Sequence, residues 1–160
     1  MSVLISFISI AVLTAVDQVI KLFVECYLQP IGSAEFINGF IGWNYVRNTG
    51  AAFGSFSQST TLLSIVTGIV ILAGIVLIAT KKIKSKFYLT CAVMVISGGL
   101  GNLIDRVLKG YVVDFIEVQF TDFAVFNFAD ILVTVGAIAI MIYVIVDMFR
   151  ERKKTGEKHE

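Results

Sequence analysis

Two aspartates in the second half of the chain lie in strongly apolar surroundings. Asp114 interrupts the sequence YVVDFIEV, and Asp130 follows FNFA directly before a long apolar run. Placing a carboxylate among apolar side chains costs free energy, so such residues are retained where they have a partner or a chemical task. Two carboxylates that share one site act as general acid and general base. Asp114 and Asp130 are therefore our candidate catalytic pair, although Asp130 alone also fits a simple helix cap.

Few other side chains in the chain support catalysis. The single histidine, His159, lies in a charged tail, which argues against histidine-based triads and histidine-containing metal sites. Cys26 and Cys91 are too few, and too far apart in the topology described below, to suggest a disulfide. No serine or cysteine has a credible base beside it. We therefore expect carboxylate chemistry with no metal and no other cofactor.

The composition is that of an integral membrane protein. Hydrophobic residues make up 57% of the 160 residues, and charged residues only 16%. Thr60 to Thr80 and Phe87 to Ile104 contain no charged residue, and each is close to the length of about 20 residues that crosses a bilayer. Two further apolar stretches, one of them interrupted by Asp17 and Lys21, bring the number of predicted spans to four. The sequence predicts membrane-spanning helices at about residues 3–24, 60–80, 87–107 and 130–149.

Basic residues predict the orientation of these helices. They fill the connection between the second and third spans and the C-terminal tail: Lys81, Lys82, Lys84, Lys86, Arg150, Arg152, Lys153, Lys154 and Lys158. Because basic loops stay in the cytoplasm, both termini are expected there, with residues 28–59 and 108–129 on the outer side. No Lys or Arg precedes Lys21, so the first span does not resemble a cleaved signal peptide and is expected to remain. The formal net charge of +1 gives no indication of a nucleic-acid partner.

On the first and third predicted spans, polar residues and glycines lie on one face of each helix. On the first span they are Thr14, Asp17, Gln18 and Lys21, and on the third Gly98, Gly101, Asn102 and Asp105. Polar side chains within a membrane face the bundle interior, where glycines permit close helix approach. Asp17 and Lys21 are spaced for a salt bridge, whereas the sequence neighbours Asp105 and Arg106 each need a partner on another element. An internal salt bridge and a structural clamp explain these residues as well as a functional role does.

The outer segments predict a small amount of β-structure. Asn38 and Gly39 are typical hairpin-turn residues, and they lie between aromatic and β-branched residues. Residues 47–54 are polar and small, which fits either a plain loop or the close approach of a bound peptide. The secondary structure of Tyr111–Val118 stays open. The expected fold is an all-α membrane protein of one domain, residues 1–160, with four spans, a β-hairpin or small sheet between the first two and an outer loop between the last two.

The expected topology places the polar side chains of the spans near the outer surface. Nothing ionisable lies at the middle of the second, third or fourth span, and the two halves of the chain show no repeat, which disfavours an ion-coupled transporter with a midplane site. A small transporter subunit that binds protons or cations through its aspartates is the alternative function. A non-catalytic assembly protein held together by the same polar residues is a second alternative. A reaction centre at the outer membrane surface fits the distribution better.

Five sequence blocks resemble a known family. In chain order they are DQVIK, NTGAAFG, GGLGNLIDR, VVDF and FNFAD. Their order and spacing over nearly the whole chain resemble lipoprotein signal peptidase, the bacterial signal peptidase II. The resemblance implies a membrane aspartic endopeptidase of the bacterial cytoplasmic membrane that removes the signal peptide of diacylglyceryl-modified prolipoproteins just before the lipidated cysteine. It also implies membrane lipid as a partner, and we expect a monomer.

The same resemblance assigns roles to individual residues. It implies that Asp114 of VVDF and Asp130 of FNFAD form the catalytic dyad, with the active site at the extracytoplasmic face. Supporting or substrate-binding roles are implied for Asp17, Lys21, Asn48, Gly50, Ala51, Gly101, Asn102, Asp105, Arg106, Asn127 and Ala129. Within these blocks the sequence shows no departure from the family pattern.

Overall fold

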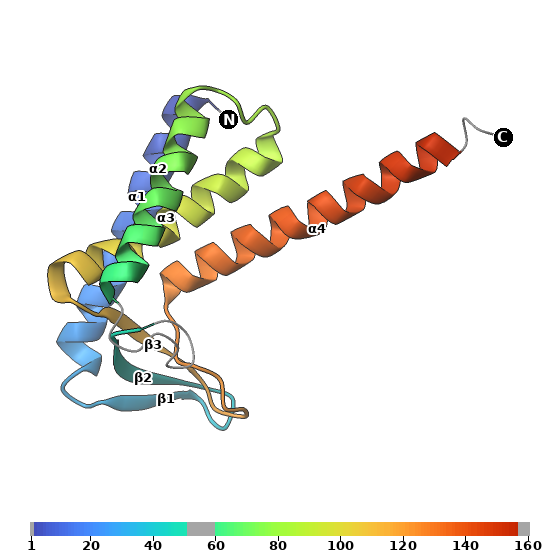
Figure 1. The fold of residues 1–160 in the computed structure, drawn as a ribbon. Coiled ribbons are helices and arrows are strands. Elements are labelled where there is room, and N and C mark those ends of the chain that lie inside the picture. The colour runs from blue at the N-terminus through green and yellow to red at the C-terminus, as the bar shows by residue number, and fades with distance from the viewer. Residues whose placement is uncertain (1, 51–59, 157–160) are drawn as a thin grey trace.

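The computed structural model of the chain describes residues 2–50 and 60–156, which form long helices and a small sheet (Figure 1). In chain order the elements are α1 (Val3–Phe23), the π-helical turn η1 (Val24–Leu28), β1 (Ser33–Ile37), β2 (Ile41–Asn48), α2 (Thr60–Ala79), α3 (Lys86–Lys109), β3 (Val112–Val118) and α4 (Phe128–Gly156). In that part of the chain, four helices are long and apolar enough to cross a membrane, which confirms the four expected spans. Helix α4 begins at Phe128 rather than near residue 130, because the Asn127 side chain caps it.

Helix α3 is the centre of the bundle. It packs against α1, α2 and α4, and buried apolar side chains of α1, α2 and α3 form the core: Ile10, Ile71, Ile78, Leu89, Val93 and Ile96. Glycines allow the closest helix approach, since a Cβ at Gly98 would collide with the Ala129 carbonyl oxygen of α4, and one at Gly136 would lie 3.0 Å from the Cys91 carbonyl oxygen. Toward its C-terminal end α4 tilts away from α1 and α2 (Figure 1).

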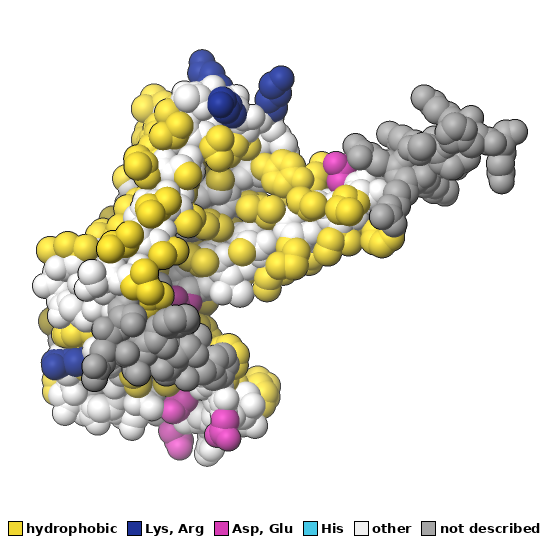
Figure 2. Space-filling view, viewed as in Figure 1, with side chains coloured by type: hydrophobic (Ala, Val, Ile, Leu, Met, Phe, Trp, Pro, Cys, Tyr) yellow, Lys and Arg dark blue, Asp and Glu magenta, His cyan; other side chains and the backbone are white. Residues whose placement is uncertain are grey.

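The outer surface of the helices is apolar. On α2 alone, the side chains that are at least half exposed include Leu62, Ile65, Ile69, Leu72 and Val76. Side chains of this kind cover the helices, while basic residues gather at the end of the helices opposite the sheet (Figure 2). That end carries the α2–α3 connection, and the N-terminus lies there too (Figure 1). An apolar surface of this extent faces lipid.

The strands form one antiparallel sheet with the order β1-β2-β3 (Figure 1). Gly39 lies in the turn between β1 and β2 with a φ of 69°, a conformation that glycine adopts without strain. The hairpin expected between the first two spans is thus confirmed. β3 pairs with β2, so that Val46 lies opposite Asp114 and Ile41 opposite Val118. The connection between the third and fourth spans, expected as an outer loop, therefore also contributes a strand.

The burial of β3 explains why its sequence did not identify it as a strand. Val112 and Val113 are nearly inaccessible, and Phe115 is also buried, so side chains on both faces of the strand are covered. A strand that is buried on both faces lacks the alternation of polar and apolar residues that marks a half-exposed strand. Asp114 is therefore a carboxylate within a buried strand.

Candidate active site

Asp114 lies in the buried first half of β3. Gly110 ends α3 with a φ of 80°, and the chain then turns into the strand. Asp114 is 2% exposed, and each of its oxygens accepts a hydrogen bond from a side-chain amide. Asn48 Nδ2 donates to Oδ2 at 2.8 Å, and Asn127 Nδ2 donates to Oδ1 at 2.6 Å. Because Asn48 ends β2 and Asn127 precedes α4, the carboxylate is held from two sides.

Asp130 lies in the first turn of α4 and takes part in an arrangement of the capping-box type. Asn127 Oδ1 accepts a hydrogen bond from the Asp130 N–H at 2.9 Å, and Asp130 Oδ2 accepts one from the Asn127 N–H at 3.1 Å. Asn127 is thus the N-cap residue, and Asp130, considered as the cap from sequence, instead supports the cap from inside the first turn. The other oxygen, Oδ1, accepts a hydrogen bond from Asn102 Nδ2 at 2.8 Å. Capping therefore uses only one oxygen of Asp130.

One buried amide joins the two aspartates. Asn127 is fully buried, and its Nδ2 donates both to Asp114 Oδ1 and, at 3.1 Å, to Asn102 Oδ1. The same residue exchanges two hydrogen bonds with Asp130 at the start of α4. Asp114 and Asp130 therefore belong to one hydrogen-bonded group.

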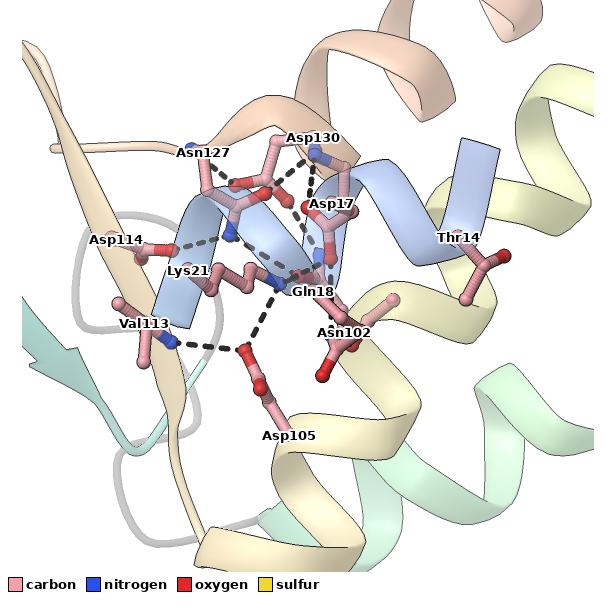
Figure 3. A network of polar contacts seen from close by, with 12 residues as sticks. Thr14, Asp17, Gln18, Lys21, Asn102, Asp105, Val113, Asp114, Asn127 and Asp130 are labelled. Atoms are coloured by element: carbon pink, nitrogen blue, oxygen red, sulfur yellow. Dashed lines mark hydrogen bonds and ion pairs between the residues drawn. The ribbon is translucent and has the colours of Figure 1, made fainter. Parts of the chain in front are cut away.

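A buried ammonium group belongs to the same network (Figure 3). The Lys21 side chain is fully buried, and its Nζ lies 2.9 Å from Asp17 Oδ2 and 3.0 Å from Asp105 Oδ2. Its third contact is a hydrogen bond of 2.9 Å to Asn102 Oδ1. The expected salt bridge between Asp17 and Lys21 is confirmed, and Asp105 has its partner on another element, also as expected.

Asp17 and Asp105 each also accept a hydrogen bond from a backbone N–H group. Asp17 Oδ1 accepts a hydrogen bond from the Ala129 N–H in the first turn of α4 at 3.1 Å. Asp105 Oδ2 accepts one from the Val113 N–H of β3 at 3.3 Å. A Cβ at Gly101 would collide with the Asp17 carboxylate, so this glycine makes room for it. The two polar helix faces thus meet the start of α4 and the start of β3.

Arg106 approaches the site from α3. Its Nη2 donates to the Gly50 carbonyl oxygen at 3.4 Å, so this residue also has its partner outside its own helix. The Gly50 N–H donates to Asn48 Oδ1 at 2.9 Å, which connects the turn to the residue that holds Asp114. Ala51, the one remaining predicted residue, lies outside the described residues. The structure brings the other predicted residues together where the helices meet the sheet.

A cavity of about 440 Å³ lies beside the two aspartates. Asp114 and Asp130 line it together with Asn48, Asn102 and Arg106, and its other walls are mostly apolar: Val112, Phe123, Ala124, Val125, Phe126, Ile131, Thr134 and Val135. The sequence interpretation did not include these walls. On α4 they recur at the spacing of one helix face, a signal that becomes readable once Asp130 is placed in the first turn.

The surroundings of Asp114 make its carboxyl group harder to ionise than that of an ordinary aspartate. Burial raises the pKa of Asp114 to about 6, and the charge of Asp130 contributes to the increase. Hydrogen bonds from Asn48 and Asn127 and the charge of Lys21 lower this pKa but do not outweigh burial. A protonated and an ionised carboxyl group beside one cavity can donate and accept a proton in the same reaction.

The raised pKa of Asp114 predicts how stability changes with pH. The carboxyl group has a pKa of 3.8 in its ordinary state and about 6 in the folded protein, so between these values the folded state binds more protons than the unfolded state. The free energy of unfolding should therefore fall as pH rises from about 4 to about 6, by up to about 3 kcal/mol from this group. Thermal unfolding of wild type and Asp114→Asn over this range measures the effect, and parallel pH profiles for the two proteins would contradict it.

Comparison with known proteins gives a consistent result. A sequence profile described as signal peptidase (SPase) II matches residues 9–146. The lipoprotein signal peptidase of Caldanaerobacter subterraneus subsp. tengcongensis is 44% identical over 131 residues, which cover 81% of this chain and 88% of that protein. The lipoprotein signal peptidase of Clostridium acetobutylicum is 40% identical over 151 residues, which cover 92% of this chain and 96% of that protein. A solved bacterial membrane enzyme is 35% identical with a TM-score of 0.81 and covers 89% of this chain and 88% of its own.

The chain has helices long enough to span a membrane and a cavity lined by two aspartates, and its fold matches that of a solved bacterial membrane enzyme. These features indicate an integral membrane enzyme. Its relatives are bacterial, which indicates a multi-pass protein of the inner membrane. The chain belongs to the signal peptidase II family and is a peptidase. The resemblance drawn from the five sequence blocks is thus confirmed. Membership of this peptidase family argues against the two alternative functions, a transporter subunit and a non-catalytic assembly protein.

Proposed function

We propose that this peptidase removes the signal peptide of diacylglyceryl-modified bacterial prolipoproteins by cutting just before the lipidated cysteine, with Asp114 and Asp130 as its catalytic dyad. One observation carries the proposal: the two aspartates line the same cavity and are both bonded to Asn127. The substrate class is taken from the relatives, which are named lipoprotein signal peptidases.

Asp114 and Asp130 have complementary roles in the proposed reaction. In the reactive form of the dyad Asp114, whose pKa is raised, carries the proton and passes it to the scissile carbonyl oxygen. Asp130 takes a proton from a water molecule as the water oxygen attacks the carbonyl carbon. The C–N bond then breaks as Asp130 gives its proton to the leaving amine. Asp114 recovers a proton from the hydroxyl group that becomes part of the new carboxyl group, so the dyad returns to its starting state.

The other residues of the site hold the dyad and the substrate in place in this proposal. Arg106 and Asn48 line the cavity and orient the scissile peptide or the dyad. Gly50, which contacts both of them, leaves room for a peptide backbone. Asn102 and Asn127 donate to the catalytic carboxyl groups and limit their rotation.

The membrane positions the substrate in the proposed reaction. The site lies where the helices meet the sheet, at the end opposite the cluster of basic side chains at the α2–α3 connection (Figure 2), which supports an extracytoplasmic site and cytoplasmic termini. The acyl chains of the modified cysteine hold it at the lipid headgroups, so its scissile bond lies at that depth and the attack becomes effectively intramolecular. One chain carries both aspartates, so a monomer is sufficient.

Cleavage of a defined substrate tests the proposed function. Purified protein in lipid is incubated with a prolipoprotein that carries the diacylglyceryl group, and the fragments are identified by mass spectrometry. We expect a single cut directly before the modified cysteine. The same precursor without the lipid should remain uncut, because its scissile bond is not held at the depth of the site. Equal cleavage of both precursors, or a cut elsewhere, would refute this assignment.

Removal of metal ions is expected to leave this cleavage unchanged. The two carboxyl groups supply both the acid and the base, so the proposed reaction requires no Lewis acid. The rate with excess EDTA should equal the rate without it. A rate that falls in EDTA and returns with an added divalent cation would show that the two aspartates are not sufficient.

A further inference from the structure

Each aspartate of the proposed dyad directly follows a residue whose backbone N–H donates a hydrogen bond to a buried carboxylate. Ala129, which precedes the second aspartate, donates to Asp17 Oδ1 at 3.1 Å. Val113, which precedes the first, donates to Asp105 Oδ2 at 3.3 Å. These two hydrogen bonds restrain the backbone immediately before each catalytic carboxyl group.

One ammonium group holds both of these carboxylates (Figure 3). Lys21 Nζ lies 2.9 Å from Asp17 Oδ2, 3.0 Å from Asp105 Oδ2 and 2.9 Å from Asn102 Oδ1. An ammonium group has three N–H donors, so these contacts use all of them. Asn102 in turn donates to Asp130 Oδ1 at 2.8 Å. Lys21 is therefore connected to the start of β3 through Asp105 and to the start of α4 through Asp17 and Asn102.

We propose that Lys21 is a positioning residue that sets the distance between the catalytic carboxyl groups of Asp114 and Asp130. It acts through the backbone before each aspartate and through Asn102 rather than on the reacting atoms. The lysine lies on α1, whereas the two aspartates lie on β3 and α4, so one side chain fixes the relative position of two other elements. This inference rests on the proposed function.

A merely structural ion pair does not account well for this arrangement. A buried ion pair often contributes no more stability than apolar side chains of similar volume, and its best-attested use is to select one geometry among several. Geometry matters for a dyad because two carboxyl groups share one proton only when they are close together. A displacement of about 1 Å can lower a catalytic rate about 100-fold.

The variant Lys21→Met tests this role, because it removes the three donors and keeps most of the side-chain volume. Asp105 keeps an ion pair with Lys109 at 3.3 Å, and Asp17 keeps a hydrogen bond from Gln18 at 3.2 Å, so the variant is expected to fold. With the lipid-modified prolipoprotein as substrate, we expect kcat to fall by about 100-fold or more and KM to change by less than about threefold, because the cavity remains intact.

Thr14→Val is the matched control. Thr14 is buried on the same face of α1, one turn before Asp17, and its hydroxyl donates to the Ser97 carbonyl oxygen of α3 at 3.3 Å. The substitution removes a buried hydrogen bond between α1 and α3 but leaves the hydrogen bonds of Asp17 and Asp105 to the backbone before each catalytic aspartate. Its kcat should stay near the wild-type value even where its thermal midpoint falls. An equal loss of kcat in both variants, or a folded Lys21→Met protein with wild-type kcat, would overturn the proposal.

A second pair of variants decides the question if Lys21→Met does not fold. Asp105→Asn keeps an oxygen that accepts the Val113 N–H, whereas Asp105→Ala removes it. We expect kcat to be at least about tenfold higher for Asp105→Asn than for Asp105→Ala, and equal kcat values at equal thermal midpoints would overturn the proposal.

The variant Asp114→Asn in the same assay separates this inference from the proposed function. If Asp114→Asn keeps full turnover, the dyad itself is wrong and the proposed function fails. If Asp114→Asn loses turnover while folded Lys21→Met keeps it, only the role of Lys21 is refuted.

Discussion

Asp114→Asn and Asp130→Asn are each expected to lower kcat for cleavage of a lipid-modified prolipoprotein by about 10³-fold or more. In the proposed reaction each aspartate both gives and takes a proton, and an asparagine of nearly the same shape does neither. Positioned acid–base groups typically contribute about 10²- to 10⁴-fold to a rate, so the loss of either one should dominate the kinetics. The measurement is turnover at saturating substrate with equal amounts of folded protein.

Loss of folding is a smaller concern for these two substitutions than for most buried positions. Asp130→Asn keeps an oxygen for the cap of α4, and Asp114→Asn removes a charge whose burial is unfavourable. Asp122→Asn, in an exposed turn after β3, is the control and should keep wild-type turnover. Wild-type turnover in either dyad variant would reduce that aspartate to a structural role, and Asp105 or Asp17 would become the next candidate.

Two alanine substitutions on α3 are expected to disturb the dyad without replacing it. A Cβ at Gly98 would lie against the Ala129 carbonyl oxygen and 2.8 Å from Val133 Cγ2 of α4. A Cβ at Gly101 would lie against the Asp17 carboxylate, 2.9 Å from its Cγ. Both contacts bear on the first turn of α4, so this turn must shift relative to β3. We expect Gly98→Ala and Gly101→Ala to lower kcat by about 100-fold or more in the same cleavage assay.

Gly99→Ala is the control on the same helix. The atoms nearest to a Cβ at Gly99 belong to the Ile71 side chain, at 3.3 and 3.4 Å, and this side chain can move. All three substitutions improve helix propensity by the same amount, about 1 kcal/mol, so differences among them report the close contacts. Similar kcat values for Gly98→Ala, Gly99→Ala and Gly101→Ala would show that the dyad tolerates a change in the packing of α3 against α4.

The features that could be predicted from sequence are those that a bilayer imposes on any chain. Long apolar runs must cross the membrane as helices, and polar residues at helical spacing must face inward, so the spans and their polar faces were readable. The salt bridge between Asp17 and Lys21 was predicted from the same spacing, and in the structure Lys21 Nζ lies 2.9 Å from Asp17 Oδ2. Asp114 and Asp130 stood out as candidates because the residues around them are apolar.

The features that could not be predicted depend on how separate elements meet. Helical spacing places Lys21 on the inner face of α1, but it does not show that the ammonium group also binds Asp105 on α3. Asn127 was predicted as a supporting residue only through the family resemblance. Its hydrogen bonds to Asp114 and Asp130 form only where β3 and α4 meet in the fold. The apolar walls of the cavity were missed because they come from three separate segments, each of which also fits ordinary packing.

The two ends of α4 are held to different extents, which affects how the protein adapts to bilayers of different thickness. Asn127, Asp130 and Asp17 hold the first turn of α4, while the other end of the helix tilts away from α1 and α2 (Figure 1). A membrane helix meets a thinner or thicker hydrocarbon layer by changing its tilt. Because α4 is hydrogen-bonded at its first turn and packs on α3 as far as Tyr143, which stacks on Phe87, we expect such a change to displace the turns beyond Tyr143 most and the catalytic carboxyl group least. We therefore expect hydrophobic mismatch to be absorbed far from the dyad, so that the spacing of the two carboxyl groups changes little with bilayer thickness.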